Sequence, residues 1–205
     1  MPLKKGIVGL IPAAIVILFL SLAIGVTKWQ DKVDDLTVYI EHERYADLWE
    51  FCNRTILTYS KSTGSGLGSE TVRETSPTSC ADIADVFTAR MTKFNNIVKN
   101  VMFAALACIV IACLGILVKY FILKEWIHEK LQIRLGFISA AMAFFSGALA
   151  IVAFGVYNVE VKYEGFTPHA GFYLTLTTGI LSWISSVLFL SSSLCIGASM
   201  YPDMT

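Results

Sequence analysis

The segment DLWEFC, residues 47–52, lies in a polar stretch between the first two long apolar runs of the chain. Within it, Trp49 stands three residues before Cys52. Trp29 precedes the segment, just past the first apolar run, and Cys80 follows it. Apolar runs flank this motif on both sides, so the class of protein has to be inferred from the runs first.

Four apolar runs of about 20 or more residues are long enough, at 1.5 Å per residue, to cross a hydrocarbon core of about 30 Å. They are Gly6 to Thr27, Val101 to Leu123, Leu135 to Tyr157 and Phe172 to Ser199. Only helices can cross in an open chain, because lipid offers the backbone amides no partner. Hydrophobic residues make up 55% of the chain, and their clustering leaves no soluble core of any size. The sequence therefore predicts an all-α membrane protein, a four-transmembrane-helix bundle in one domain over residues 1–205.

The predicted spans cover residues 7–27, 99–121, 135–157 and 172–197. The first is interpreted as a retained span. A cleaved signal peptide is the alternative, but its apolar region is only about 7 to 15 residues long. Two outer segments, 28–98 and 158–171, and a short connection, 122–134, lie between the spans.

Basic residues predict the orientation, because cytoplasmic loops carry an excess of them. Lys4 and Lys5 precede the first span. Around the connection, the charged residues are Lys119, Lys124, Lys130 and Arg134 against Glu125 and Glu129. We therefore expect a multi-pass plasma membrane protein with cytoplasmic N- and C-termini and both outer segments outside the cell.

The cysteines divide between the two environments. Cys52 and Cys80 lie in the long outer segment, whereas Cys108, Cys113 and Cys195 lie in spans. Two cysteines in an oxidising compartment are expected to form a disulfide, worth about 3 to 4 kcal/mol in the chain-entropy picture, with two free thiols as the alternative. Cys195, near the cytoplasmic end of its span, is a candidate for palmitoylation; a small buried core residue is the alternative.

Asn53-Arg54-Thr55 is the one N-glycosylation sequon in the chain. It lies in the outer segment, where a glycan could be added. The neighbouring Cys52 is the argument against its use, because disulfide formation can hide the acceptor.

Local patterns predict a small extracellular antiparallel β-sheet formed by the two outer segments and seated on the helix ends. Apolar and polar residues alternate at 36–41 and at 159–163, as in strands. Ser60 to Ser69 is Gly/Ser-rich and predicts a flexible loop. A helical spacing predicts a short amphipathic helix from Ala81 into the second span. Its apolar residues are Ile83, Phe87, Met91 and Phe94.

The tryptophan and cysteine pattern resembles a known family. Trp29, Leu48-Trp49 with Cys52, and Cys80 resemble the W, [G/D]LW-x-x-C and C signature of the claudin and peripheral myelin protein superfamily, which includes the gamma subunits of calcium channels. Ala89-Arg90 resembles the Ala-Arg pair that claudins place before their second span.

The approach to the fourth span also resembles claudins, at Tyr163-Glu164-Gly165 and Ala170-Gly171-Phe172-Tyr173. The chain departs from them in its wider interval between the two cysteines and in Asp47, which replaces Gly. The branch of the superfamily therefore stays open.

The motif suggests how the sheet is held. A tryptophan beside a disulfide at the membrane surface can bury its ring against the helix ends. If Trp49 is buried as a core residue, Trp49→Ala is expected to cost about 3 to 5 kcal/mol, whereas Trp29 can also be an interfacial anchor. On the third span, Ser139, Ala143 and Gly147 form a small-residue strip that serves either the bundle or a partner helix.

No catalytic, cofactor-binding or metal-ligating set is predicted. His128-Glu129 lacks the second histidine of a zinc protease helix, and the glycines at 64–68 lack the Lys-Ser/Thr of a phosphate loop. The spans read as nearly free of charge, which disfavours a transporter or a pore through the monomer. We expect a protein that is not an enzyme and that binds neither nucleic acid nor a small-molecule substrate, with a membrane enzyme as a remote alternative.

The resemblance implies contact between proteins in or across membranes. The leading expectation is cell–cell adhesion or a paracellular barrier at cell junctions, by self-association in cis and trans. The alternative is an auxiliary, gamma-type subunit that modulates the gating or trafficking of an ion channel or receptor. Asp203-Met204-Thr205 lacks the terminal hydrophobic residue with which many claudins engage PDZ scaffolds.

Charge bears on the barrier hypothesis. Residues 28–97 carry eight Lys or Arg and eleven Asp or Glu, a net charge of −3. Such a surface favours cations by its field, whereas an ordinary solvated surface is the alternative. The acidic clusters are Asp31-Asp34-Asp35 and Glu41-Glu43-Asp47-Glu50.

Overall fold

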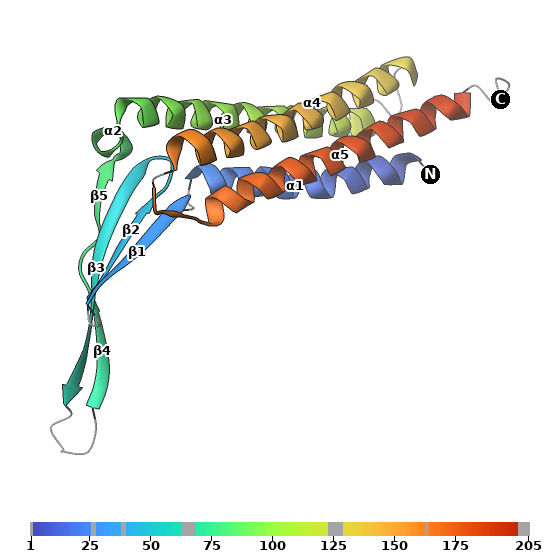
Figure 1. Cartoon of the computed structure of the whole chain (residues 1–205). Helices are drawn as coiled ribbons and strands as arrows, with labels where there is room; N and C mark the ends of the chain where they lie inside the picture. The colour runs from blue at the N-terminus through green and yellow to red at the C-terminus, as the bar shows by residue number, and fades with distance from the viewer. Residues whose placement is uncertain are drawn as a thin grey trace.

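Four long helices lie side by side and an antiparallel sheet extends from one end of them (Figure 1). The computed structural model describes residues 2–25, 28–37, 40–62, 69–122, 129–162 and 164–200. The long helices are α1 (Pro2–Gly25), α3 (Ala89–Leu117), α4 (Glu129–Val156) and α5 (Ala170–Met200). A π-helical turn extends α3 as η1 (Val118–Ile122) and another extends α4 as η2 (Tyr157–Val161).

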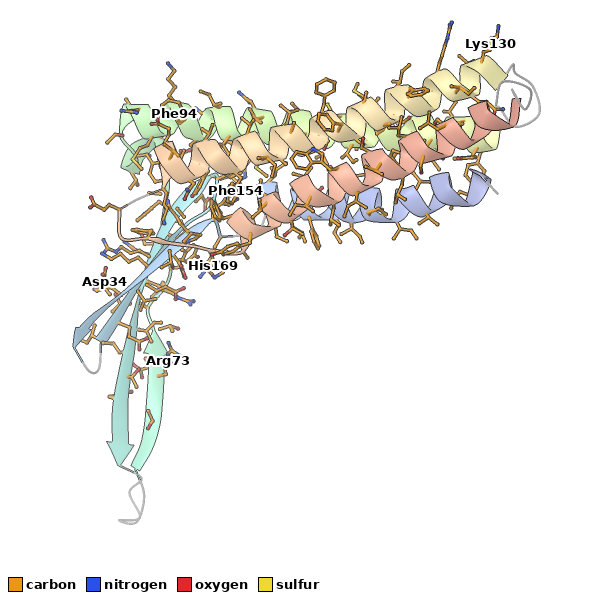
Figure 2. The ribbon with its side chains drawn as sticks, turned by 45° about the vertical axis from the view of Figure 1, so that its right-hand side comes forward. Asp34, Arg73, Phe94, Lys130, Phe154 and His169 are labelled. Carbon is orange, nitrogen blue, oxygen red and sulfur yellow. A yellow bond between two sulfur atoms is a disulfide. The ribbon has the colours of Figure 1, made fainter. Side chains whose placement is uncertain are left out.

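All four helices are long and apolar enough to cross a membrane, as the sequence predicts. Only about a third of each apolar window is buried inside the bundle, so most of the apolar surface faces outward, where lipid would cover it. The start of α1 and the end of α5 lie at the end opposite the sheet (Figure 1). Figure 2 shows Lys130 at that same far end, whereas Asp34 and Arg73 lie on the sheet.

The helices form a closed bundle in which α5 packs between α1 and α4, and α3 between α4 and α1. The small-residue strip of α4 belongs to this internal packing. Ser139 and Ala143 are buried, and a Cβ on Gly147 would come within 2.6 Å of the Trp183 ring. Of the two uses predicted for this strip, the structure therefore supports the internal one.

The sheet has six strands, all paired antiparallel. They are β1 (Gln30–Thr37), β2 (Ile40–Ala46), β3 (Glu50–Ser62), β4 (Ser69–Thr75), β5 (Ser79–Asp82) and β6 (Thr167–Pro168). Their order is β4-β3-β2-β1-β6, with β5 paired to the first part of β3. Because β6 comes from the second outer segment, the sheet does combine both segments, as predicted.

Two of the predicted strands are wrong in detail. The alternation at 36–41 belongs to two strands and not to one, since β1 ends at Thr37 and β2 begins opposite it, at Ile40, whereas residues 38 and 39 lie outside the described residues. Residues 159–161 continue a helix as η2, with Val161 buried and Val159 exposed. Five alternating residues are too few to outweigh continuation of a long helix whose next turn packs against α3. Tyr163 lies outside the described residues.

The predicted helix from Ala81 into the second span is also interrupted. The disulfide strand β5 holds residues 79–82 extended, and α2 (Ile83–Val86) is a single turn capped by Asp82. Thr88 then caps α3, which begins at Ala89, ten residues before the predicted span at 99. The predicted flexible loop covers Ser60 to Ser69. Its residues 63–68, between β3 and β4, lie outside the described residues.

Candidate functional site

Two indole N–H groups cap free carbonyl oxygens at the C-terminal end of α1. Trp29 Nε1 donates to the carbonyl oxygen of Ala23 at 2.7 Å, and Trp49 Nε1 donates to that of Ile24 at 2.6 Å. The last carbonyls of a helix have no partner within the helix, and leaving them unpaired in an apolar setting is costly. The two signature tryptophans thus join the first span to the sheet through hydrogen bonds as well as packing.

The two tryptophans differ in burial, and the predicted core burial of Trp49 is wrong, although its ring does lie against the end of α1. Trp29 is fully buried, with its ring centroid 4.6 Å from that of Tyr157. Trp49 is 41% exposed, and Lys99 Nζ lies 4.3 Å from its ring centroid. The neighbouring Leu48 takes the buried position, so Trp49 covers the edge of the core and Trp29 fills it.

The turn that carries Leu48 and Trp49 is held from several sides. The Asp47 side chain accepts hydrogen bonds from the backbone N–H groups of Trp49, at 2.6 Å, and Glu50, at 2.7 Å. Asn95, fully buried on α3, donates Nδ2 to the carbonyl oxygen of Leu48 at 2.9 Å. Asp47 is thus the acceptor that shapes this turn. Sequence reasoning missed Asn95, whose signal is a polar residue at the start of an apolar run.

The predicted disulfide is confirmed. Cys52 on β3 is bonded to Cys80 on β5, which stands directly opposite it in the sheet, at a sequence separation of 28 residues. Glu50 lies close to both sulfur atoms. Because each sulfur is bonded to the other, no thiolate remains there to bind a metal.

Arg90 joins the start of α3 to the second outer segment. Its Nη2 and Nε atoms lie 2.7 Å and 3.1 Å from Oε2 of Glu160 on η2. The structure therefore brings Arg90 to the same end of the bundle as the tryptophans, although its side chain is exposed. Exposed pairs of this kind contribute little stability, about 0 to 1 kcal/mol.

On the sheet, the acidic cluster at Asp31 to Asp35 is balanced by basic neighbours. Asp34 accepts a hydrogen bond from the Arg44 guanidinium and pairs with Lys32 Nζ at 3.0 Å. These two partners, Arg44 above all, hold the pKa of Asp34 below its ordinary value. The Asp35 side chain lies outside the described residues.

The second acidic cluster is balanced in the same way. Burial raises the pKa of Glu43, but hydrogen bonds from Lys28 and Arg54, at 2.7 Å and 2.6 Å, outweigh it and leave that pKa below its ordinary value. Glu41 pairs with Arg73 at 3.1 Å. Asp34, Glu41 and Glu43 are thus paired with basic side chains, whereas the net charge of −3 over residues 28–97 already counts these bases and is unchanged.

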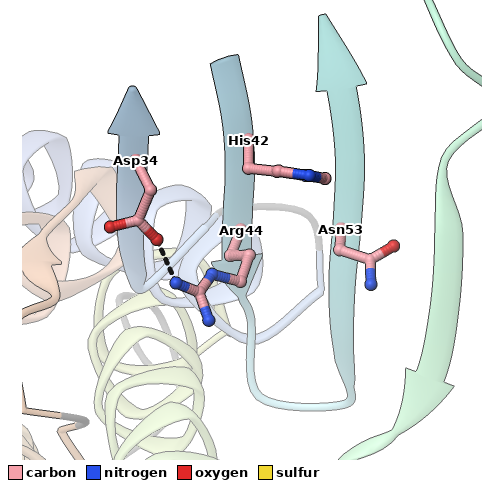
Figure 3. Close-up of a pocket in the computed structure, with 4 residues that line it drawn as sticks. All are labelled: Asp34, His42, Arg44 and Asn53. Atoms are coloured by element: carbon pink, nitrogen blue, oxygen red, sulfur yellow. Dashed lines mark hydrogen bonds and ion pairs between the residues drawn. The ribbon is translucent and has the colours of Figure 1, made fainter. Parts of the chain in front are cut away.

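A pocket of about 380 Å³ lies on one face of β1, β2 and β3 (Figure 3). It is lined by Asp34, His42, Arg44 and Asn53, whose side chains stand on the same face. Asn53 is the exposed acceptor of the sequon, and Thr55 Oγ1 lies 3.2 Å from Nδ1 of His42.

Among the residues whose side chains the structure describes, one charged residue is buried within the bundle, where the sequence predicts spans nearly free of charge. Lys119, expected beside the cytoplasmic connection, is only 2% exposed, and its Nζ donates to Ser193 Oγ at 3.2 Å. Gly136 makes room, because a Cβ there would lie 2.9 Å from Nζ. Cys195 follows on α5, but its side chain lies outside the described residues.

No known family model matches the chain, and no curated protein matches it. The fold and site therefore define the class by themselves. It is a four-helix membrane protein with a disulfide-linked antiparallel sheet at one end.

Proposed function

We propose that this chain is a claudin-like membrane protein, without enzymatic activity, that mediates cell–cell adhesion or forms a paracellular barrier through its sheet. In this proposal the sheet faces the outside of the plasma membrane, both termini are cytoplasmic, and copies of the chain associate in cis and in trans. The two capping tryptophans, the disulfide and Arg90 support the resemblance to that superfamily.

The far part of the β3–β4 hairpin is the observation that carries the proposal. Within the part of the chain that the structure describes, β3 pairs only with β4 beyond Leu57, and β4 is the last strand of the sheet. Figure 1 shows this two-stranded ribbon projecting past the side of the helix bundle. A two-stranded ribbon is marginally stable in water, and an unpaired strand edge readily adds another strand. A ribbon of this kind is suited to contact another protein.

The ribbon also presents apolar side chains. Leu57 and Tyr59 are 42% and 37% exposed, and Val72 stands opposite Tyr59. Alternation along the strands places these three residues on the same face. An exposed apolar strip along a projecting element is typical of a protein contact surface.

Expression in cells that lack junctions tests the proposal. We expect the tagged protein to concentrate at contacts between expressing cells and to make those cells aggregate. Even distribution over the surface, with no aggregation at a surface level that antibody labelling confirms, would contradict it.

The auxiliary-subunit function is the second candidate, and a different surface favours it. Phe144, Phe145 and Trp183 are exposed on the outer side of α4 and α5, and the rings of Phe144 and Trp183 stack at 6.1 Å. A partner helix could pack against this aromatic cluster. Co-purification of a channel or receptor in mild detergent, without cell aggregation, would favour this candidate over adhesion.

A further inference from the structure

The pocket on the sheet includes the side chain to which a sugar could be attached. Asn53 lies on β3, between Arg44 on β2 and Ser79 on β5. Its side chain is exposed, and it shares the pocket with Asp34, His42 and Arg44 (Figure 3). Any group carried by Asn53 would therefore start beside a preformed polar pocket of about 380 Å³.

The strand geometry removes the conflict between the sequon and the disulfide. Successive side chains of a strand point to opposite faces, so Asn53 and Thr55 share one face and Cys52 points to the other. The disulfide to Cys80 is thus made on the face opposite Asn53. A glycan attached before folding can remain in place when the disulfide closes.

We propose that Asn53 carries an N-glycan whose first N-acetylglucosamine occupies the pocket of Asp34, His42 and Arg44. In the transfer, Nδ2 of Asn53 bonds to C1 of the sugar and loses one proton. The bond from C1 to the diphosphate of a lipid-linked oligosaccharide breaks, and the diphosphate leaves with its electron pair. The inference rests on the outward-facing sheet of the proposed function.

Arg44 supplies donors for the sugar. A guanidinium carries five N–H groups, and Nη2 is the one that bonds Asp34. Nε of Arg44 is buried and has no hydrogen-bond partner among the described residues. The acetamido carbonyl of the sugar can accept from this guanidinium, and Asp34 can accept from a sugar hydroxyl.

The glycan also restricts where a protein partner can bind. A sugar in the pocket covers the base of the sheet over β1 to β3. Leu57 and Tyr59 lie farther along β3, past the residues that line the pocket. Because Leu57 and Tyr59 stand on the same face of β3 as Asn53, the sugar bounds the apolar strip of the ribbon on its side toward the helices.

The experiment uses the full-length protein purified in detergent from cells that make only high-mannose glycans. Endoglycosidase H removes all but the first sugar, so three forms can be melted side by side: intact, trimmed, and the unglycosylated variant Asn53→Gln. We expect the intact form to melt about 2 to 4 °C above Asn53→Gln, a shift typical of one contact in a domain of this size. The trimmed form should keep most of that gain.

Arg44→Gln and Arg54→Gln provide a matched pair. The two arginines have similar exposure and each bonds a carboxylate, but on opposite faces of the sheet. We expect Arg44→Gln to remove the gain from the sugar and Arg54→Gln to keep it.

An unmodified Asn53 in wild-type protein would overturn the proposal. A trimmed form that melts with Asn53→Gln, or equal loss of the gain in both arginine variants, would do the same. Failure of the adhesion assay would contradict the proposed function and leave these melting differences unchanged.

Discussion

The junction between sheet and helices and the ribbon of β3 and β4 are built in opposite ways. At the junction, Trp29, Leu48 and Asn95 are fully buried, and the Trp29 indole and the Asn95 amide donate to the carbonyls of Ala23 and Leu48. Along the ribbon, Leu57 and Tyr59 are exposed, and at Tyr59 the described partner strand is β4, whereas Leu57 still pairs with β2 as well. The tryptophan and cysteine motif thus lies where the fold is held together, whereas the residues proposed for contact lie elsewhere. This difference explains why the signature indicates the fold and leaves the partner open.

The largest effect is expected inside the junction. Trp29→Ala should lower the free energy of unfolding by about 3 to 5 kcal/mol, because it empties a core position and exposes the carbonyl of Ala23. Trp49→Ala should cost about 1 to 2 kcal/mol, the sum of one hydrogen bond and one exposed cation–π contact. Unfolding of both variants in mild detergent gives the comparison. A larger loss for Trp49→Ala would contradict the assignment of Trp29 as the core residue.

The disulfide should rank next. Cys52→Ser is expected to cost about 3 to 4 kcal/mol, because the bond closes a long loop between β3 and β5. The measurable result is impaired folding and reduced delivery to the cell surface. Cys80→Ser should behave in the same way, and Cys108→Ser, within α3, is the control. Surface levels equal to the parent would contradict a structural role for the bond.

The ionic contacts on the sheet should have a smaller effect that depends on pH. Because the folded-state pKa of Glu43 lies below its ordinary value of 4.5, its contribution is present above about pH 4.5 and is lost as the pH falls through the folded-state value. Glu43→Gln should therefore lower stability by up to about 1 kcal/mol at neutral pH and by less in acid. Melting curves of both proteins from pH 7 to pH 3 measure this difference. A difference that grows as the pH falls would contradict it.

Much of the fold could be predicted from the sequence, because its strongest signals are local. Four charge-poor runs define four helices, and two cysteines in one polar segment define the disulfide. The signals that failed were short or depended on distant residues. The alternation at 159–161 could not reveal that α4 continues past Val156, because the support comes from packing against α3.

The candidate site was predicted only in part for the same reason. The motif identified Trp29 and Trp49. It could not show that Trp29 is the buried one, because this depends on its packing against the distant Tyr157. Asn95 reaches a carbonyl 47 residues earlier in the chain, and no local pattern encodes that distance. From the sequence, Lys119 is a surface lysine at the end of a span. Its burial depends on the space left by the missing side chain of Gly136, which lies on another helix.

The most direct test of the central claim is cell aggregation by a ribbon variant that still folds. Leu57→Lys places a charge on the exposed apolar strip and should change stability by no more than about 0.5 kcal/mol. Val33→Lys, also exposed but on β1 outside the ribbon, is the matched control. We predict that Leu57→Lys reaches the surface at the wild-type level and abolishes aggregation, whereas Val33→Lys aggregates normally. Normal aggregation by Leu57→Lys, or equal loss in both variants, would contradict the assignment of contact to the ribbon.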